Sequence, residues 1–312
     1  IVSMPRTATT ALHRTMATDT SRWNTFDLAD MVKPLPPISR SDHKSRAKLV
    51  KKVRRAVVNP IDLFYPGWFE CLETMNSQVI DEADEDLGLY NSGLGILYQD
   101  TLLHLQPKKN IEAMALESAE MATYRYAWLD MIMRIYQKLE PDNNKTWLMK
   151  DPKHTAFLPQ LIQQFPDARF VFIHRVPGDI LASMAKLFMC FSCVSVNLKA
   201  PGIKSADWGQ YTLKKASFFL NGIVEYSKRY PMDEDKRIDF AFSELTADLT
   251  GSIERIYDMC FNQKPSRQAK TIMQSYIEKQ RVEKKEAQTR QLKDFHLTEE
   301  DVIFDEYRKI FL

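Results

Sequence analysis

The chain has 312 residues, 44% of them apolar and 11% aromatic, which is enough to build the core of one large α/β domain and argues against a disordered or collagen-like protein. Its 43 basic and 41 acidic side chains leave a net charge of only +2, which argues against a protein that binds nucleic acid over its whole surface. The nine glycines, about 3% where roughly 7% is usual, complete neither the dinucleotide-binding nor the ATP-binding glycine motif. Any phosphate groups that this chain binds are therefore held without those glycines.

The apolar runs of the chain are short. None approaches the roughly 20 residues that span a bilayer, so no transmembrane segment is predicted and a cytoplasmic protein is favoured. The chain opens at Ile1 without an initiator methionine, so an upstream signal or anchor remains an open alternative. The four cysteines are too few and too dispersed for a disulfide scaffold or a zinc site and are predicted to be free thiols.

Strand-like and helix-like patterns alternate along the chain. Strands are predicted at residues 1–4, 145–149, 169–173 and 238–242, and helices follow them at 9–17, 157–165, 178–188 and 249–261. The run at 169–173 is continuously apolar, which is typical of a parallel strand that is buried on both faces. We therefore expect a single α/β domain over residues 1–312, in which helices flank both faces of a mainly parallel sheet.

A long segment, about residues 30–140, interrupts this alternation and has helical patterning, which predicts a helical cap. Within it, residues 40–55 carry one acid and eight basic side chains, with Leu49, Val53 and Ala56 on the opposite helix face. A solvated face is one interpretation of these cations, and a surface for an anionic substrate or a membrane is the other. Residues 81–86 hold five acids and predict a polar loop rather than a metal site.

The loop after the first predicted strand is rich in groups that bind anions. Arg6 offers a guanidinium, Thr7, Thr9 and Thr10 offer hydroxyls, and the start of the next helix offers free amides. Ligands of parallel sheets bind at the carboxyl ends of the strands, so this loop is a candidate phosphate cradle. The alternative is a capped helix with an exposed arginine.

The loops after two further strands carry cations to the same edge of the sheet. Lys150 and His154 follow the strand at 145–149, where an imidazole is a natural general base and an ammonium stabilises charge on a leaving group. Arg175 follows the strand at 169–173, and Ser183 lies on the next helix, so this pair could hold a second phosphate from two sides. Alternatively, Asp179 caps that helix and pairs with Arg175.

Three stretches together carry a family resemblance: Met4–His13 (MPRTATTALH), Trp147–His154 (WLMKDPKH) and Phe165–Arg175 (FPDARFVFIHR), the last continuing to Ser183. They resemble the sulfotransferases that use 3′-phosphoadenosine-5′-phosphosulfate (PAPS), in particular the bacterial-type branch with its Pro-Arg-Ser-Gly-Thr-Thr loop. Phe242–Leu245 resembles the family's Tyr-x-Asp-Leu segment, and Leu292–Leu297 resembles the C-terminal Leu-x-Asp-Phe-Gly-Leu. The similarity covers nearly the whole chain in order, and the cap matches only loosely.

The resemblance implies a P-loop-like fold and in-line transfer of a sulfuryl group from PAPS to a hydroxyl, with 3′-phosphoadenosine-5′-phosphate (PAP) as the product and no metal. It implies that Arg6, Thr7, Ala8, Thr9 and Thr10 form the 5′-phosphosulfate loop and that Arg175 and Ser183 hold the 3′-phosphate. It further implies that Phe242 stacks on the adenine, that His154 is the general base, and that Arg6 and Lys150 stabilise the leaving phosphate.

The sequence departs from the family pattern at several positions. Ala8 replaces the usual glycine of the loop, which requires either a negative φ or local strain. Phe242 replaces a tyrosine, so stacking is retained and a hydroxyl contact is lost. The C-terminal Arg-Lys-Gly signature of cytosolic relatives is missing, and Arg290, Lys284 or Lys285 are the candidates to replace it at the 3′-phosphate.

Two other functions remain open from the sequence. A phosphotransferase that uses ATP is disfavoured by the missing Walker residues, and a non-catalytic nucleotide-binding protein of the same fold is supported only by Ala8 and Phe242. The acceptor is not determined: a small molecule, a lipid and a glycan are all compatible, and so is any oligomeric state. Six apolar residues are candidates for either an acceptor pocket or the core: Phe64, Tyr65, Trp68, Phe69, Met184 and Phe188.

Overall fold

The computed structural model describes residues 1–58, 63, 80–86, 89, 118–140, 144–192, 204–230, 235–283 and 291–312. Its strands are β1 (Trp23–Asn24), β2 (Thr146–Trp147), β3 (Phe170–His174) and β4 (Arg237–Ala241). β1 pairs with β2 and β3 pairs with β4, and both pairs are parallel, as predicted. β1 was not predicted from the sequence, because two residues are too few to establish an alternating pattern.

Residues 1–4 connect the two strand pairs. The amino group of Ile1 donates to the carbonyl of Met149 just beyond β2 at 2.7 Å, and the amide of Val2 donates to the carbonyl of Val171 in β3 at 2.9 Å. On the same segment, the hydroxyl of Ser3 accepts from the amide of Ile173 at 2.6 Å. The segment is not assigned as a strand, yet it occupies the position between the pairs that the predicted first strand requires.

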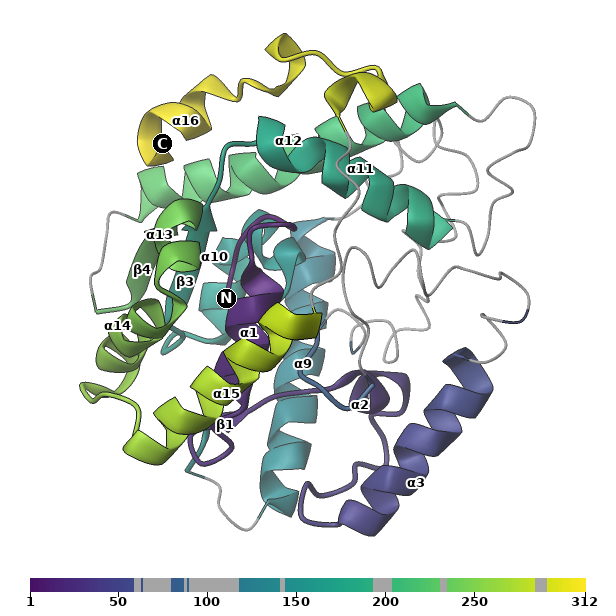
Figure 1. Ribbon diagram of the computed structural model, residues 1–312, viewed down its shortest axis with the longest axis vertical. Coiled ribbons are helices and arrows are strands. Elements are labelled where there is room, and N and C mark those ends of the chain that lie inside the picture. Colours follow the sequence, from purple (N-terminus) through teal and green to yellow (C-terminus); the bar gives the residue numbers. More distant parts are fainter. Residues whose placement is uncertain are drawn as a thin grey trace.

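The helices agree with most of the predicted boundaries. The helices at 9–17 and 249–261 are confirmed residue for residue, whereas the one predicted at 178–188 extends to Ser192. In chain order they are α1 (Thr9–Ala17), α2 (Leu28–Val32), α3 (His43–Val53), α9 (Ala119–Leu139), α10 (Leu158–Gln164), α11 (Gly178–Ser192), α12 (Ser205–Arg229), α13 (Phe242–Ala247), α14 (Leu249–Phe261), α15 (Arg267–Glu283) and α16 (Asp305–Phe311) (Figure 1). Short π- or 3₁₀-helical turns are η1 (Arg54–Val58), η3 (Pro152–Ala156), η4 (Leu292–Phe295) and η5 (Glu300–Val302).

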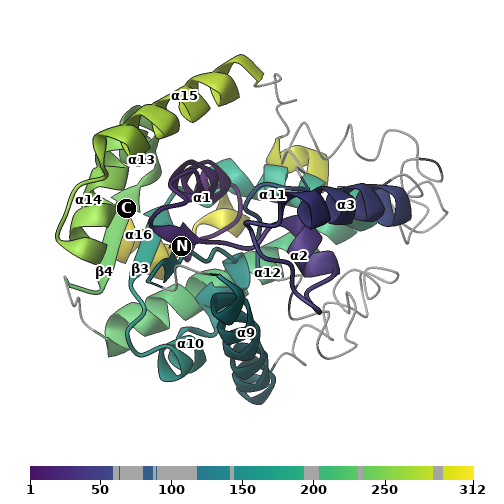
Figure 2. The same ribbon diagram turned by 90° about the horizontal axis from the view of Figure 1, so that it is seen from below.

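Alternate residues of β3 pack into two different cores. Phe170 and Phe172 face a core formed mainly by α9, α10, α11 and α12. Val171 and Ile173 face the other core, built with α1, α14 and α15. The strands thus lie between two helical layers, as the view from below shows (Figure 2). This confirms the three-layer α/β architecture, since a strand buried on both faces needs helices on both sides.

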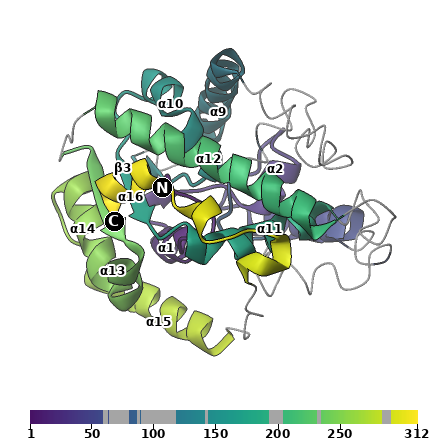
Figure 3. The ribbon, with the colours of Figure 1, turned by 90° about the horizontal axis from the view of Figure 1, so that it is seen from above.

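α12 links several parts of the molecule. It contacts α10, α11, η3 and the C-terminal α16, and the view from above shows it running across the molecule (Figure 3). Its contact with η3 is especially close, because a Cβ on Gly222 would meet the carbonyl oxygen of Thr155 at 2.1 Å. α12 therefore fixes the position of the segment that carries His154.

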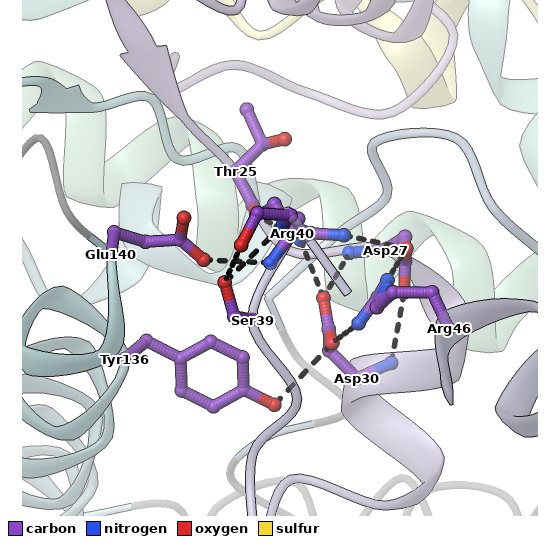
Figure 4. A network of polar contacts seen from close by, with 9 residues as sticks. Thr25, Asp27, Asp30, Ser39, Arg40, Arg46, Tyr136 and Glu140 are labelled. Carbon is purple, nitrogen blue, oxygen red and sulfur yellow. Dashed lines mark hydrogen bonds and ion pairs between the residues drawn. The ribbon is translucent and has the colours of Figure 1, made fainter. Parts of the chain in front are cut away.

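Within the predicted cap, the described residues form the helices α2, α3 and α9 with non-helical segments between them, and a buried ionic network holds α2 and α3 (Figure 4). Arg40 contacts Asp27 at 2.8 Å and Asp30 at 2.5 Å, and Arg46 of α3 also forms ion pairs with both carboxylates. Asp30 is fully buried, so its charge needs these partners. The network joins α2 and α3 into one unit.

The described cysteines differ in their state. Cys260 is a free thiol, as predicted, whereas Cys190 is disulfide-bonded, so the prediction of a free thiol is wrong for Cys190. Within the described ranges, no helix has both the length and the apolar character needed to cross a bilayer.

Candidate active site

The loop between residues 4 and 9 has an unusual backbone. Arg6 has φ of 68° and Ala8 has φ of 64°, and both lie in the left-handed region that favours glycine. The hydroxyl of Thr7 is buried and donates to the carbonyl of Met4 at 2.7 Å, so it closes the loop. Among the described residues, no side-chain cap of the first turn of α1 is formed, and its amides are a candidate anion-binding group. The interpretation of this loop as a capped helix is wrong.

Two arginines meet where this loop approaches the end of β3. Nε of Arg6 donates to the hydroxyl of Ser183 at 3.0 Å, and a terminal nitrogen of Arg175 donates to the carbonyl of Arg6 at 3.0 Å. The guanidinium of Arg175 also lies over the ring of Phe242, 4.0 Å from its centroid. Arg175 thus contacts Arg6 and Phe242, whereas Asp179 of the first turn of α11 acts on it only through its charge. Four predicted site residues come together here.

The electrostatics of this cluster favour an anion. Burial, and then the charge of Arg175, lower the pKa of Arg6. Burial likewise lowers the pKa of Arg175, whose buried Nε has no hydrogen-bond partner among the described residues. Two partly buried guanidinium groups at close range repel each other, and an anion between them offsets both penalties.

A second cluster surrounds Lys150, which follows β2. Its side chain is almost fully buried, and Nζ contacts the hydroxyl of Thr10 at 3.4 Å and a carboxylate oxygen of Glu85 at 2.8 Å. Thr10 belongs to the first turn of α1, so the loops after the first segment and after β2 meet at this ammonium group. The side chain of Glu85 is 32% exposed, which makes it the solvent-facing member of the pair.

His154 of η3 is buried beside this cluster and has both ring nitrogens engaged. Nε2 lies 3.1 Å from an oxygen of Asp86, and Nδ1 lies 3.1 Å from the hydroxyl of Tyr126 in α9. Burial alone would lower the pKa of His154, but the charge and hydrogen bond of Asp86, together with the charge of Asp151, raise it above its ordinary value. The imidazole is therefore held in a setting that favours its protonated form.

Asp151 is a second perturbed carboxyl group in this cluster. Burial, and then the neighbouring charge of Asp86, raise the pKa of Asp151 to about 7. One of its oxygens accepts from the amide of Lys153 at 2.7 Å, and the other is buried without a hydrogen-bond partner among the described residues. A perturbed carboxyl of this kind beside a histidine and a lysine is typical of functional sites.

The acidic stretch at residues 81–86 was predicted to be a polar loop, and the structure gives its side chains specific partners. Arg14 of α1 forms an ion pair with Glu82 at 3.2 Å, while Glu85 and Asp86 contact Lys150 and His154. The described residues contain no group of histidine, cysteine and acidic side chains arranged to hold a metal ion. Sequence reasoning missed Glu85, Asp86 and Tyr126, because only their distant partners show that they belong to the site.

Several predicted residues lie elsewhere. Arg290, Lys284 and Lys285 fall outside the described residues, as do Phe64, Tyr65, Trp68 and Phe69. Met184 is fully buried in the core with α12, and Phe188 packs against that core. Thr9 is buried in the first turn of α1, so its backbone amide rather than its hydroxyl is the group offered by that residue.

Comparison with known proteins identifies a family and a fold. The profile described as the sulfotransferase family matches residues 1–261. Two solved structures are similar over the chain: sulfotransferase STF9 from Mycobacterium avium (TM-score 0.76, 18% identity, covering 100% of this chain and 76% of that one) and sulfotransferase STF1 from Mycobacterium tuberculosis H37Rv (0.72, 21%, 99% and 76%). No curated protein matches the sequence significantly. The P-loop-like α/β fold is thereby confirmed.

Proposed function

Because the chain belongs to the sulfotransferase family, we propose that it transfers a sulfuryl group from PAPS to an acceptor hydroxyl. The observation that supports this proposal is the meeting of Arg6 and Arg175 beside Ser183, two partly buried cations at a loop with left-handed backbone, where α1 starts without a capping side chain at Ala8. This arrangement is incomplete without an anion. A donor with two separate phosphate groups fits the two clusters at the sheet edge.

The donor's groups are assigned by the charges around them. Arg175 and Ser183 are proposed to hold the 3′-phosphate, because the buried Nε of Arg175 has no acceptor among the residues that the structure describes. Phe242, already stacked under that guanidinium, would extend an aromatic surface to the adenine. Arg290 remains a candidate third ligand of the 3′-phosphate. PAPS supplies an activated sulfuryl group, and the amides and side chains of residues 6–10 bind its 5′-phosphosulfate end.

The reaction needs a base, an acceptor and stabilisation of the leaving group. The acceptor oxygen forms a bond to sulfur as the bond from sulfur to the 5′-phosphate oxygen breaks, PAP leaves with that electron pair, and the hydroxyl proton passes to the base. Arg6 and Lys150 are proposed to stabilise the charge that develops on the 5′-phosphate. Lys150 is well suited to this, because the enclosure of its ammonium strengthens any Coulombic contact.

His154 is our candidate for the base, and its surroundings set the conditions for that role. It must exchange its contact with Asp86 or Tyr126 for the acceptor hydroxyl, and it must be neutral. Glu85 is the competing candidate, because it is half-exposed, beside Lys150, and therefore reaches the solvent side of the site. Glu85 contacts Lys150 directly, whereas His154 contacts Asp86, the residue that follows Glu85 in the chain.

Calorimetry tests the donor site. Wild type is expected to bind PAP and not ATP, and Arg175→Ala is expected to weaken PAP binding by about tenfold to a hundredfold, since each charge-assisted hydrogen bond contributes about 1.5–3 kcal/mol. Arg255→Ala, which removes an exposed arginine paired with Glu244, is the matched control and should bind PAP normally. Equal affinity for ATP would favour a phosphotransferase and contradict the proposal.

Transfer assays separate the two candidate bases. With PAPS and a panel of hydroxyl compounds, turnover by His154→Gln and by Glu85→Gln is compared with wild type. Loss of about a hundredfold or more in only one variant identifies the base, because general-base catalysis contributes typically 10²–10⁴-fold. Normal PAP binding without any turnover in wild type would instead support a non-catalytic nucleotide-binding protein.

A further inference from the structure

The outer face of α3 and η1 is a continuous row of cations. Lys44, Lys48, Lys51, Lys52 and Arg55 are all exposed and recur at helical spacing, so they lie on one side over about 16 Å. We call these five residues the cationic face. Asp42 is the only acid between residues 40 and 58, so the row is hardly neutralised by its own segment. Figure 1 shows α3 at the edge of the molecule, away from the strands.

The orientation of this face is fixed by what lies on the opposite side of α3. Leu49 and Val53 are buried in a small core with Ala29 and Ile80. Arg46 points the same way and pairs with Asp27 and Asp30 (Figure 4). On this inner side, Arg40 and Arg46 form ion pairs with Asp27 and Asp30. This arrangement leaves the cationic face pre-organised, because the helix cannot rotate without breaking buried ion pairs.

The cationic face also has a hollow. A depression of about 410 Å³ is lined by Lys48, Lys51, Lys52, Arg55 and Ala56. This volume is within the range of sites for small ligands, roughly 300–1,000 Å³, and corresponds to a few sugar rings rather than a single ion. The lining offers four positive charges and one methyl group, so a ligand for it needs several negative charges and little apolar surface.

We propose that the cationic face binds an acidic polysaccharide, and that a hydroxyl of this polysaccharide is the sulfuryl acceptor. The second clause rests on the proposed function, whereas the binding itself does not. A row of cations at intervals of about 5–6 Å along a helix matches the repeated charges of an extended acidic chain. Carboxylate-bearing sugars are anionic before any sulfation, so they can be recognised as substrates.

A membrane fits this face less well. Helices that lie on membranes insert their apolar side into the lipid, and the apolar side of α3 is already buried in the protein. The observations therefore favour a discrete acidic chain, and a membrane becomes an outcome of the test.

The test measures binding of an octamer of galacturonic acid by calorimetry, with an uncharged glucose octamer of equal length as the control ligand. The variant Lys48→Gln, Lys51→Gln, Lys52→Gln, Arg55→Gln keeps helix propensity and removes four charges. The matched control Lys214→Gln, Arg267→Gln, Arg308→Gln, Lys309→Gln removes four exposed cations from α12, α15 and α16.

Wild type should bind the acidic octamer and not the neutral one. The α3 variant should lose about tenfold or more of this affinity, and the control variant should stay within about twofold. Equal loss in both variants, or binding by wild type only to vesicles of 30% phosphatidylserine in phosphatidylcholine, would overturn the proposal. If the acidic chain is the acceptor, the α3 variant should show a raised KM for this chain and an unchanged kcat. If wild type instead sulfates other hydroxyl compounds and leaves the acidic octamer unsulfated, that result would overturn the acceptor part of the proposal.

PAP calorimetry keeps this proposal separate from the proposed function. If wild type fails to bind PAP, the sulfotransferase assignment fails whatever the octamer does. If wild type binds PAP but not the acidic octamer, the donor site stands and the polysaccharide proposal fails.

Discussion

At Ala8, the backbone has the left-handed conformation that a glycine would adopt without penalty, with φ of 64°. The sequence left two possibilities for this residue, a relaxed negative φ or local strain, and the structure has the strained one. A side chain in this region costs about 1 kcal/mol relative to glycine. Strain of this kind is often retained where a backbone must present its amides to a ligand.

Ala8→Gly is therefore expected to stabilise the protein by about 0.5–1 kcal/mol, since the relief of left-handed strain exceeds the extra entropy of glycine in the unfolded chain. Urea denaturation measures this change. The matched control is Ala11→Gly, which lies at an exposed position inside α1 and should destabilise by about 1 kcal/mol. Destabilisation by both substitutions would show that the loop is relaxed at Ala8.

His154 makes stability depend on pH in a defined direction. Its pKa in the folded protein is raised, so the folded state binds its proton more tightly than the unfolded state does. The resulting stabilisation is fully present below the ordinary histidine pKa of about 6.5 and is lost as pH rises through the raised value. Urea midpoints between pH 5.5 and 9 should fall with pH in wild type, and less steeply in His154→Gln.

Asp151 provides the control for this experiment, because its pKa, raised to about 7, also makes the folded protein less stable as pH rises. In Asp151→Asn, a smaller slope due to His154 should remain, because Asp86 still raises the pKa of His154 while the charge of Asp151 is gone. If His154 is also the base, kcat/KM of wild type should increase as pH rises through the same raised pKa. An activity that is flat across this range would remove His154 from that role.

Single residues also show which parts of the candidate site could be predicted from the sequence and which could not. Four site residues could be predicted because each follows a recognisable strand or lies in the next helix: Arg6, Lys150, Arg175 and Ser183. The carboxyl ends of parallel strands lie at the same edge of the sheet, so these residues were expected to lie close together. Glu85 could not be predicted, since it lies 65 residues from Lys150 in an acidic stretch that resembles any solvated loop. Its contact with Lys150 is a property of the folded chain only.

At the scale of elements, helices were easier to predict than strands. α14 extends over the predicted residues because a long amphipathic pattern establishes its period, whereas β1 and β2 have two residues each. Residues 1–4 have a strand-like sequence, but their hydrogen bonds are divided between Met149, Val171 and Ile173 rather than forming one regular ladder. Such short parallel pairings depend on the helices that cover them.

The contact between α12 and η3 predicts a substitution that acts on the site from outside it. In Gly222→Ala, the new Cβ would lie 2.1 Å from the carbonyl oxygen of Thr155 and 2.8 Å from Cα of Ala156, so η3 must move. Because His154 lies on η3, we expect kcat/KM for PAPS-dependent transfer to fall about tenfold or more. Destabilisation of about 1–3 kcal/mol should accompany this change.

Gly209→Ala is the matched control on the same helix. Its Cβ would meet the carbonyl oxygen of Phe295 at 2.1 Å, at a contact that does not involve η3. It should destabilise to a similar degree and leave kcat/KM of the folded enzyme within about threefold of wild type. Similar losses of activity in both variants would show that η3 is not the element through which Gly222 acts.

For the whole molecule, a net charge of +2 conceals an uneven distribution. Cations gather at the Arg6 and Arg175 cluster and along α3, while carboxylates gather at residues 81–86. An anion bound at the arginine cluster should therefore stabilise the entire fold. PAP at 100 times its Kd is expected to add about 2.7 kcal/mol, which corresponds to about 4 °C in Tm for a chain of 312 residues.

Thermal unfolding with and without PAP measures this stabilisation. Arg175→Ala should abolish most of the shift while leaving the Tm without ligand unchanged or slightly higher, because one of two repelling cations is gone. A lower Tm without ligand in this variant would mean that Arg175 serves the fold rather than the ligand. Inorganic sulfate at equal ionic strength separates specific binding from salt screening.

The hydrogen bonds of residues 1–4 also order events during synthesis. Residues 1–4 can form their native hydrogen bonds only after Met149 and Val171 have been synthesised. β3 can pair with β4 only after residues 237–241 have been synthesised as well. At 5–20 residues per second, this interval is roughly 10–50 s. Throughout it, the apolar side chains of Ile1, Val2 and Met4 lack their native core, so the growing chain is a natural client for a ribosome-associated chaperone.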